Sequence, residues 1–410
     1  MTALHAWPLS QWLIACACGG AALYAIFAAL AMPFFFRRER HGVPQRTHRL
    51  PAVTVFKPLC GDEPRLYDNL ATFCEQTCDR FQLLFGVSAW DDAAIAIVQR
   101  LRAAYPHIDI ELIVDARVYG SNLKVSNLIN MSAYARHDLF VIADSDIAVR
   151  PDYLATVVAP LNDASVGVVT CLYEARGIGG FWPRVGALFI NEWFVPSVRI
   201  AHAAGSRDFG FGATLALRRE TLERIGGFAA LRDCLADDYW LARHARELGL
   251  RTVLSPVVVA TDVIEQSFTA LWRRETRWLR TIRSVNRLGF ACLPISFTSP
   301  WLPFAAWLAS RASSSGHACF ATTMTVCAVA GLVARVLLHA RCTHTLRSFW
   351  RDLPLVPLRD GLFMLQWLGA TVGTHVVWRG ARVPVTASLT PPTPLDNRGI
   401  VDVMETSDGG

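Results

Sequence analysis

Charged residues are scarce in this chain. Of its 410 residues, 18% are Asp, Glu, Lys or Arg, whereas 52% are hydrophobic and the mean hydropathy is +0.30. An ordinary soluble enzyme has a more polar composition. Because the apolar stretches are concentrated towards the two ends of the chain, we expect a more polar central domain between membrane segments.

Several signals that mark other protein classes are missing. There is no basic arm or nucleic-acid motif, and the net charge of +6 suits residues that flank membrane spans and meet anionic lipid headgroups. Cys74 and Cys78 have no second pair at zinc-finger spacing, and we interpret all eleven cysteines as reduced thiols. Gly210-x-Gly212 lacks the third glycine of a dinucleotide-binding loop and precedes a predicted strand. These absences exclude a zinc finger and a dinucleotide-binding fold, and no nucleic-acid partner is expected.

The amino-terminal segment predicts a membrane anchor. Trp12 to Phe36 is an uncharged run long enough to span a bilayer, and Arg37, Arg38 and Arg40 follow it at once. A secretory signal would carry its charges before the apolar core and a cleavage site after it. By the positive-inside rule, residues 1–40 are expected to be a retained anchor in the inner (plasma) membrane, with the following domain in the cytoplasm.

The central part of the chain, residues 41–265, predicts an α/β domain. Short apolar or β-branched runs alternate with amphipathic stretches, which is typical of right-handed βαβ units and a mostly parallel sheet. The expected strands are 52–56, 83–87, 108–114, 139–143, 166–173, 213–217 and 257–261. The expected helices between the first four are 66–75, 93–104 and 124–135.

The carboxy-terminal part predicts a return to the membrane. Residues 266–290 combine tryptophans with many arginines, as in an amphipathic helix that lies in the membrane interface. A multi-pass transmembrane region is expected over residues 291–385, and its prolines leave a re-entrant course open. Its apolar spans are 293–309, 317–338 and 361–377. The polar tail, 386–410, is expected to be disordered.

Two carboxylates directly follow the apolar strand 139–143. Asp144 and Asp146 are spaced i and i+2, so in an extended segment they face the same way. At the carboxyl end of a parallel strand they would lie where α/β sheets bind ligands. Two such oxygen ligands predict a site for Mg²⁺ or Mn²⁺ that also receives a nucleotide diphosphate. A solvated turn or helix cap is the alternative.

Asp91, Asp92 and Lys124, which precede this pair in the sequence, are candidates for binding the nucleotide donor. Asp91 and Asp92 follow the second strand, where a carboxylate can accept hydrogen bonds from a base or ribose edge. Asp92 can equally be the cap of the next helix. Lys124 opens the following helix and could meet a diphosphate at the positive helix end, or it could be a solvated charge.

Asp237 and Asp238 carry the predicted chemistry. A hydroxyl group that attacks a bound substrate needs one general base to take up its proton, and Asp238 is the candidate for this base, with Asp237 as a supporting acid. An acidic first turn of the helix that follows is the alternative explanation.

The segment from Arg274 to Trp278 supplies cationic and aromatic groups. Arg274 and Arg277 are candidates for binding the diphosphate because a guanidinium fork can bind two oxygens, and Trp278 could stack on the acceptor. Interfacial arginines with a Trp anchor would give the same pattern.

The order and spacing of these motifs resemble those of inverting nucleotide-sugar glycosyltransferases. The opening segment 57–64, the Gly120-x-Asn122-x-Lys124 segment and the three acidic and basic motifs together resemble the ceramide glucosyltransferase family over residues 50–285. The resemblance implies a GT-A fold, a UDP-sugar donor, a divalent cation and a β-linked glycolipid product. Two departures are Asp146, where the eukaryotic enzymes tend to have Gly, and Asp237, where Glu is usual.

The chain also resembles the bacterial hopanoid-associated branch of that family, which adds N-acetylglucosamine to a hopanoid polyol. The expected acceptor is therefore a membrane lipid alcohol, either a hopanoid polyol or ceramide, and the expected sugar is a hexose or N-acetylhexosamine. A processive polysaccharide synthase has the same motifs and is the rival enzyme. A non-catalytic nucleotide-sugar-binding membrane scaffold is the rival of another class.

Overall fold

The computed structural model of the protein describes residues 9–32, 52–78, 80–378 and 381–384. The arginines that follow the amino-terminal apolar run and the polar tail 386–410 lie outside the described residues. The predictions made for them are therefore not tested.

An eight-stranded mixed sheet forms the centre of the domain, in the order β3-β2-β1-β4-β7-β6-β8-β5. The strands are β1 Val53–Pro58, β2 Phe81–Val87, β3 Asp109–Val114, β4 Leu139–Ile142, β5 Ile147–Ala148, β6 Val166–Gly177, β7 Leu215–Arg218 and β8 Arg251–Val263. All seven predicted strands are present. The first four strands pair in parallel, β7 runs antiparallel to both β4 and β6, and β6 and β8 are parallel.

Helices cover both faces of the sheet, because successive side chains of a strand point to opposite sides. Val55 of β1 packs with one set of helices and its neighbour Phe56 packs with another. The first set is α2 Leu66–Cys74, α3 Ala94–Ala104 and α5 Tyr153–Val158. The second set is α4 Leu123–Ser132, α8 Arg219–Arg224 and α9 Asp237–Glu247. This two-sided cover confirms the expected α/β domain.

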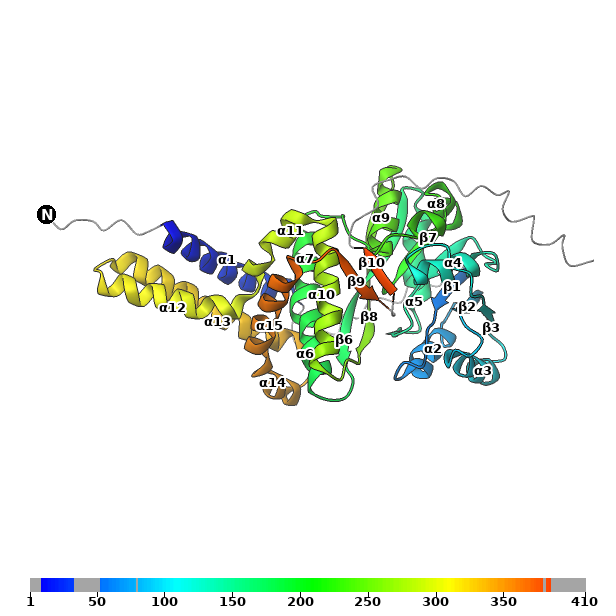
Figure 1. Cartoon of the computed structure of the whole chain (residues 1–410), viewed down its shortest axis with the longest axis horizontal. Coiled ribbons are helices and arrows are strands. Elements are labelled where there is room, and N and C mark those ends of the chain that lie inside the picture. Colours follow the sequence, from blue (N-terminus) through cyan, green and yellow to red (C-terminus); the bar gives the residue numbers. More distant parts are fainter. Residues whose placement is uncertain (1–8, 33–51, 79, 379–380, 385–410) are drawn as a thin grey trace, which may run out of the picture.

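The parallel register brings the carboxyl ends of the first four strands to one edge of the sheet. Phe56 of β1 lies opposite Ile142 of β4. Asp144 therefore leaves the sheet beside the last residues of β1. The long strands β6 and β8 extend towards helices α6 Phe181–Phe189 and α10 Phe268–Val285 (Figure 1).

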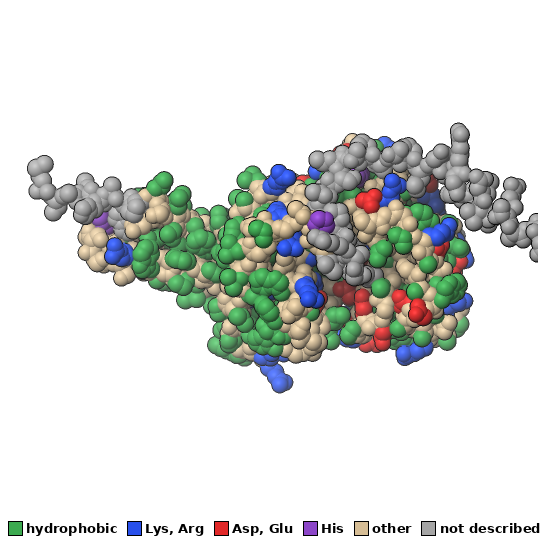
Figure 2. Space-filling model, viewed as in Figure 1, with side chains coloured by type: hydrophobic (Ala, Val, Ile, Leu, Met, Phe, Trp, Pro, Cys, Tyr) green, Lys and Arg blue, Asp and Glu red, His purple; other side chains and the backbone are tan. Residues whose placement is uncertain are grey.

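Three apolar helices project from the domain as an arm (Figure 1). They are α1 Leu9–Ala31, α12 Thr298–Ser314 and α13 Ala318–Cys342, and hydrophobic side chains cover the face of this arm seen in Figure 2. Helices α1 and α13 are long and apolar enough to cross a membrane, and α12 forms a third such unit with the residues from Arg287 to Ser296, bent by 60°. The apolar segments at 12–36, 293–309 and 317–338 are therefore helical over their described parts.

The last expected span has a different structure. Helix α15 runs over Leu355–Ala370, and the following residues form the strand β9 His375–Trp378, which pairs with β10 Ala381–Pro384. The apolar run 361–377 is thus split between a helix and a strand. Arg359 and Asp360 of α15 are buried in polar contacts, so packing against neighbouring elements decides the position of this helix.

The arginine-rich segment forms helix α10 Phe268–Val285, which packs against α15. Arg280 donates a hydrogen bond to the carbonyl of His375. Arg283 donates to the carbonyls of Ala370 and Gly373, so the two arginines contact the last residue of α15 and the chain that follows it. The membrane-interface position of this helix stays a prediction. The remaining helices are α6 Phe181–Phe189, α7 Val195–Ala203, α11 Arg287–Cys292 and α14 Leu346–Asp352, and a π-helical turn, Ile190–Phe194, joins α6 to α7.

Candidate active site

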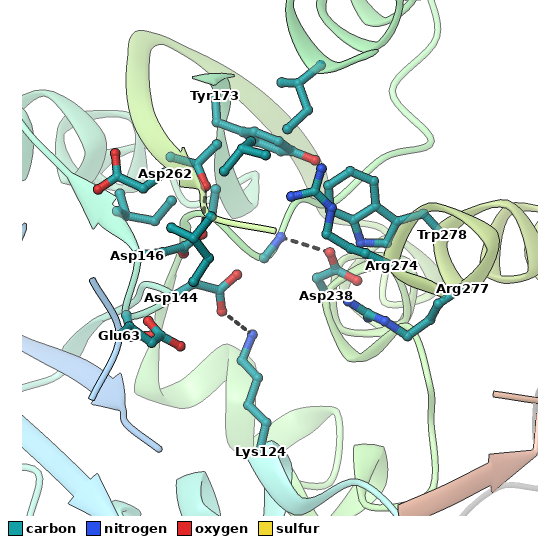
Figure 3. A pocket seen from close by; sticks show the side chains of 18 of the residues that line it. Glu63, Lys124, Asp144, Asp146, Tyr173, Asp238, Asp262, Arg274, Arg277 and Trp278 are labelled. Atoms are coloured by element: carbon teal, nitrogen blue, oxygen red, sulfur yellow. Dashed lines mark hydrogen bonds and ion pairs between the residues drawn. The ribbon is translucent and has the colours of Figure 1, made fainter. Parts of the chain in front are cut away.

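A cavity of about 390 Å³ lies at the carboxyl edge of the sheet. All the predicted site residues except Asp91 and Asp92 line it, although they come from four separate stretches of sequence. They are Lys124, Asp144, Asp146, Asp237, Asp238, Arg274, Arg277 and Trp278. Figure 3 shows acidic groups on one side of this cavity and the two arginines on the other.

The acidic side is built from the segment after β4. Asp144 and Asp146 both line the cavity, together with Glu63 from the loop after β1. Asp146 accepts a hydrogen bond from Thr261 Oγ1 at 2.6 Å. Burial raises the pKa of Asp146 to about 7, and the charges of Asp144 and Glu63 add to this rise. Negative charge is therefore concentrated here and would be relieved by a bound cation.

Lys124 is the cation that contacts this acidic side. The side chain of Asn122 caps α4 by accepting from the backbone of Val125, and this fixes the start of the helix on which Lys124 lies. Lys124 Nζ is 2.6 Å from Asp144 Oδ1 and 3.6 Å from Asp237 Oδ2. Burial lowers the pKa of Lys124, but Asp144 and Asp237 raise it by more, so the ammonium is charged. The alternative prediction, that Lys124 is a solvated charge on the helix, is therefore wrong, because its side chain is mostly buried and paired with Asp144.

Asp238 is held at the start of α9 by two backbone groups. Its Oδ2 accepts from the N–H of Gly212 at 2.8 Å, and its Oδ1 accepts from the N–H of Tyr239 at 2.8 Å. Burial raises the pKa of Asp238 to about 6, and Asp237 adds to the rise, whereas Lys124 opposes it. Helix-start acids are common, but this one is half-buried and lines a cavity, and its pKa is suited to accepting a proton near neutral pH.

The opposite side of the cavity is formed by α10. Arg274 Nη1 donates to Glu265 at 2.5 Å, and its guanidinium lies 4.9 Å from the ring centre of Trp278. Arg274 Nε and Nη2 are buried and have no hydrogen-bond partner among the described residues. Burial lowers the pKa of Arg277, and the neighbouring charge of Arg274 adds to that effect. The unused donors of Arg274, beside the charge of Arg277, form a site that an anion would complete.

Asp91 and Asp92 do not line the cavity. Asp92 accepts from the N–H groups of Gly61 and Ala94, so it caps the turn before α3 and holds the loop that carries Glu63. Asp91 is exposed. Asp92 therefore has the capping contacts that were the alternative to donor binding. A donor-binding role for either residue stays a prediction.

The donor set fits a divalent cation. Asp144 and Asp146 are carboxylates, the ligands that Mg²⁺ prefers. Lys124 binds one oxygen of Asp144 and Thr261 binds one oxygen of Asp146, and among the described side chains no donor is hydrogen-bonded to the other oxygen of either group. Among the described residues no group of three or more His, Cys, Asp or Glu side chains is arranged as a complete metal site. Phosphate oxygens of a substrate would have to supply the remaining ligands, as is usual for Mg²⁺.

Several residues of this site were not predicted from the sequence. Gly212 is one of them, because a Cβ added there would lie 3.2 Å from Asp144 Oδ2, 3.4 Å from Asp238 Oδ2 and 3.5 Å from Lys124 Nζ. Its signal in the sequence, Gly210-x-Gly212, is the pattern that was rejected as a dinucleotide loop. Glu63, Tyr173 and Glu265 also line the cavity, and no local pattern distinguishes them from surface or core residues.

A family model in the comparison with known proteins spans most of the chain. The family model described as Glycosyl transferase family 21 matches residues 17–388. Ceramide glucosyltransferase 3 of Caenorhabditis elegans is 26% identical over 255 residues, which are 61% of this chain and 54% of that protein. Ceramide glucosyltransferase 1 of the same organism is 25% identical over 249 residues, 60% of this chain and 53% of that protein. The chain thus spans about half the length of the curated relatives it matches.

Among solved structures, a mannosyltransferase from Pyrobaculum calidifontis in complex with GDP-Man and Mn²⁺ aligns with a TM-score of 0.49 and 24% sequence identity. The alignment covers 80% of this chain and 99% of that one.

Proposed function

The chain belongs to glycosyl transferase family 21, and from this premise we propose that it transfers a hexose or N-acetylhexosamine from a UDP-sugar to a lipid alcohol with inversion. The observation that carries the proposal is that a half-buried carboxylate, Asp238, lies in one cavity between an acidic side and a pair of arginines. This arrangement matches a reaction in which a hydroxyl loses a proton while a diphosphate departs.

Asp238 is the proposed general base. The acceptor hydroxyl attacks the anomeric carbon of the sugar and transfers its proton to the Asp238 carboxylate, while the bond between that carbon and the diphosphate oxygen breaks. One carboxylate is sufficient because inversion needs no covalent intermediate. Gly212 and Tyr239 restrain both oxygens of Asp238, so the base is oriented before the substrate arrives. Asp237 supports it by binding Asn122 and Lys124.

Arg274 and Arg277 are proposed to stabilise the leaving diphosphate. Their guanidiniums lie across the cavity from the acidic side, and Arg274 has buried donors that a phosphate oxygen would satisfy. Lys124 would add a third positive charge near Asp144. Mg²⁺ or Mn²⁺ held by Asp144 and Asp146 would neutralise part of the diphosphate charge when bound.

The acceptor is proposed to be a membrane lipid that reaches the cavity from the bilayer. Ile190 and Trp278 make part of the cavity wall apolar, and Ile190 begins the π-helical turn that contacts the membrane arm. The catalytic domain would lie on the cytoplasmic side, where UDP-sugars are available. Hopanoid polyols and ceramide are the two acceptor classes to compare.

UDP release tests this proposal. Membranes that carry the protein would be supplied with UDP-glucose or UDP-N-acetylglucosamine, crossed with ceramide or a hopanoid polyol. We expect one productive pair, a loss of turnover with chelator, and a rate about 10²–10⁴ lower for Asp238→Asn. Asp208→Asn is the matched control, because Asp208 is an exposed acid that binds Arg246 and lies outside the cavity.

The alternatives give different results in the same assay. A ladder of polymeric products would identify a processive polysaccharide synthase. Nucleotide-sugar binding without UDP release from any pair would support a non-catalytic scaffold. Wild-type turnover by a folded Asp238→Asn protein would contradict the assignment of the base.

A further inference from the structure

The chain contains very few lysines, and both lie at the candidate active site. Of its 40 Lys and Arg residues only two, Lys57 and Lys124, are lysines. Lys124 lines the cavity and binds the side chain of Asp144. Lys57 contacts the same aspartate from the opposite direction, because its Nζ donates to the backbone carbonyl of Asp144.

Lys57 is buried in a way that lysines rarely are. It lies near the end of β1 with none of its surface exposed, and its ammonium lies 4.0 Å from the centre of the Phe73 ring. Burying a charge costs free energy unless close partners compensate for it. The hydrogen bond to the Asp144 carbonyl and the nearby carboxylates of Asp146, Asp144 and Glu63 offset part of this cost, although burial still lowers the pKa of Lys57 to about 7.

The position of Lys57 connects it to the geometry of the acidic pair. The register of β1 and β4 places Phe56 opposite Ile142, so Lys57 comes next to the point where the chain leaves β4. From there the segment that carries Asp144 and Asp146 leaves β1 and joins the far edge of the sheet, where β5 pairs with β8. Lys57 donates a hydrogen bond to the carbonyl of Asp144 and so restrains the backbone of this segment. The backbone in turn sets the separation of the two carboxylates.

We propose that Lys57 is a positioning residue, which holds the backbone of Asp144 so that Asp144 and Asp146 present their carboxylates to one divalent cation. A lysine suits this role because its ammonium is a compact donor on a flexible stem, whereas the wide planar guanidinium of arginine needs more room. Lys57 does not line the cavity, so it acts on substrate and cation only through the aspartates. The inference rests on the cation site of the proposed function.

Mn²⁺ affinity distinguishes this role from simple electrostatics. Removing a positive charge beside two carboxylates would tighten cation binding if charge alone mattered. If Lys57 positions the pair, Lys57→Met should weaken binding by about tenfold or more, as for other residues that orient metal ligands. Free Mn²⁺ is measured by electron paramagnetic resonance during titration of the full chain in detergent, without donor or acceptor.

Stability and matched variants complete the test. Lys57→Met is expected to keep or raise the melting temperature, because it removes a buried charge while retaining the length of the side chain. Lys57→Gln is measured alongside with the same expected loss of affinity, so that one misfolded variant does not decide the result. Thr54→Val is the control, since Thr54 is a fully buried residue of the same strand and its hydroxyl binds Gln82 away from the cavity.

Two outcomes overturn the inference in distinguishable ways. Folded Lys57 variants that bind Mn²⁺ as tightly as the wild type, or more tightly, contradict the positioning role and leave the proposed reaction intact. Failure of the wild-type protein to bind Mn²⁺ contradicts the cation site itself and therefore also the positioning role of Lys57.

Discussion

Single residues set the chemistry of the cavity, and Asp238 sets its pH dependence. A general base must be ionised to accept a proton, and burial raises the pKa of Asp238 to about 6, with Asp237 and Asp144 adding to the rise and Lys124 opposing it. The positive charge of Arg277 lies near the same carboxylate. We therefore expect kcat/KM to fall as the pH drops through about 6, by about tenfold per pH unit below it. A UDP-release rate that is flat from pH 7 to pH 5 would contradict the prediction.

Gly212 is the second residue whose environment gives a prediction. A Cβ at this position would crowd Asp144 and Asp238, and the space beside the glycine is where the reacting groups converge. Gly212→Ala is expected to lower UDP release at least tenfold with little change in melting temperature, because misplacement of about 1 Å costs about 10²-fold in rate. Gly361→Ala is the matched control, since a Cβ on this α15 glycine meets no atom within 4 Å. Normal activity of Gly212→Ala would show that the space is not used.

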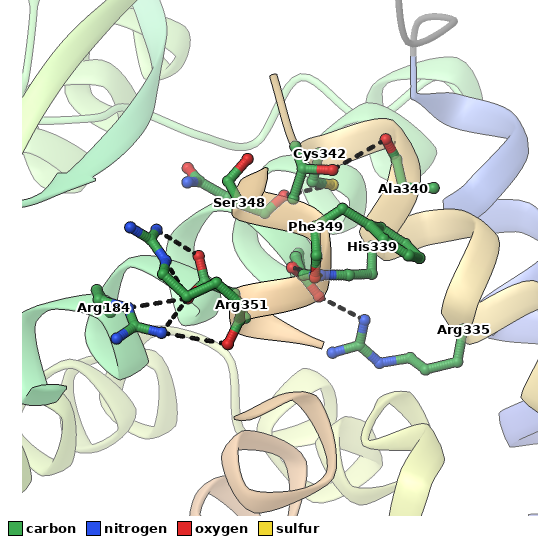
Figure 4. A network of polar contacts seen from close by, with 12 residues as sticks. Arg184, Arg335, His339, Ala340, Cys342, Ser348, Phe349 and Arg351 are labelled. Atoms are coloured by element: carbon green, nitrogen blue, oxygen red, sulfur yellow. Dashed lines mark hydrogen bonds and ion pairs between the residues drawn. The ribbon is translucent and has the colours of Figure 1, made fainter. Parts of the chain in front are cut away.

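At the scale of elements, a buried polar network ties the membrane arm to the catalytic domain (Figure 4). Arg335 of α13 binds Glu192 at 2.6 Å and Asp360 at 3.0 Å, and His339 binds Glu192 at 2.6 Å. Glu192 belongs to the π-helical turn whose first residue, Ile190, lines the cavity. An apolar helix of the arm and the cavity wall are thus joined by one turn of chain, and π-helical turns are frequent at functional sites.

Removing the central cation of this network should destabilise the protein. Arg335→Met leaves Glu192 and Asp360 buried without their shared partner, which is expected to cost about 3–5 kcal/mol of unfolding free energy. The measurement is thermal or denaturant unfolding of the purified chain in detergent. Leu332→Ala, an exposed position on the same helix, should change stability by much less. Equal stability of both variants would show that the network adds nothing to the packing of α13.

At the scale of the whole molecule, the projecting arm determines how the protein meets the membrane. Leu13, Phe27, Val329 and Val333 are among the apolar side chains that the arm exposes, each at more than half of its surface. A soluble monomer rarely exposes such a surface, and a bilayer would cover it. We expect the protein to stay in the membrane pellet after an alkaline carbonate wash and to be released only by detergent. Release by carbonate, compared with a known integral protein as a control, would contradict membrane insertion.

Local patterns were sufficient to predict the elements of the domain. The alternation of apolar and amphipathic runs predicted seven strands, and the runs 66–75, 93–104 and 124–135 correspond to α2, α3 and α4. Residues 361–377 were wrongly predicted to form one apolar span, and this error also has a local cause. Hydropathy does not distinguish a membrane span from an apolar helix followed by a strand, and it gave no sign that Arg359 would find a buried partner in Glu275 of α10.

The sequence by itself determined which residues could carry the chemistry, because acids after strands and arginines on a helix are visible as spacing. Only the tertiary structure decided which of them meet. It brought Asp144, Asp238 and Arg274 into one cavity, left Asp91 outside it, and placed Lys57 behind the acidic pair. The physical reason is that side-chain periodicity is set by neighbours in the chain, whereas a cavity is formed by strand register and packing between segments far apart in sequence.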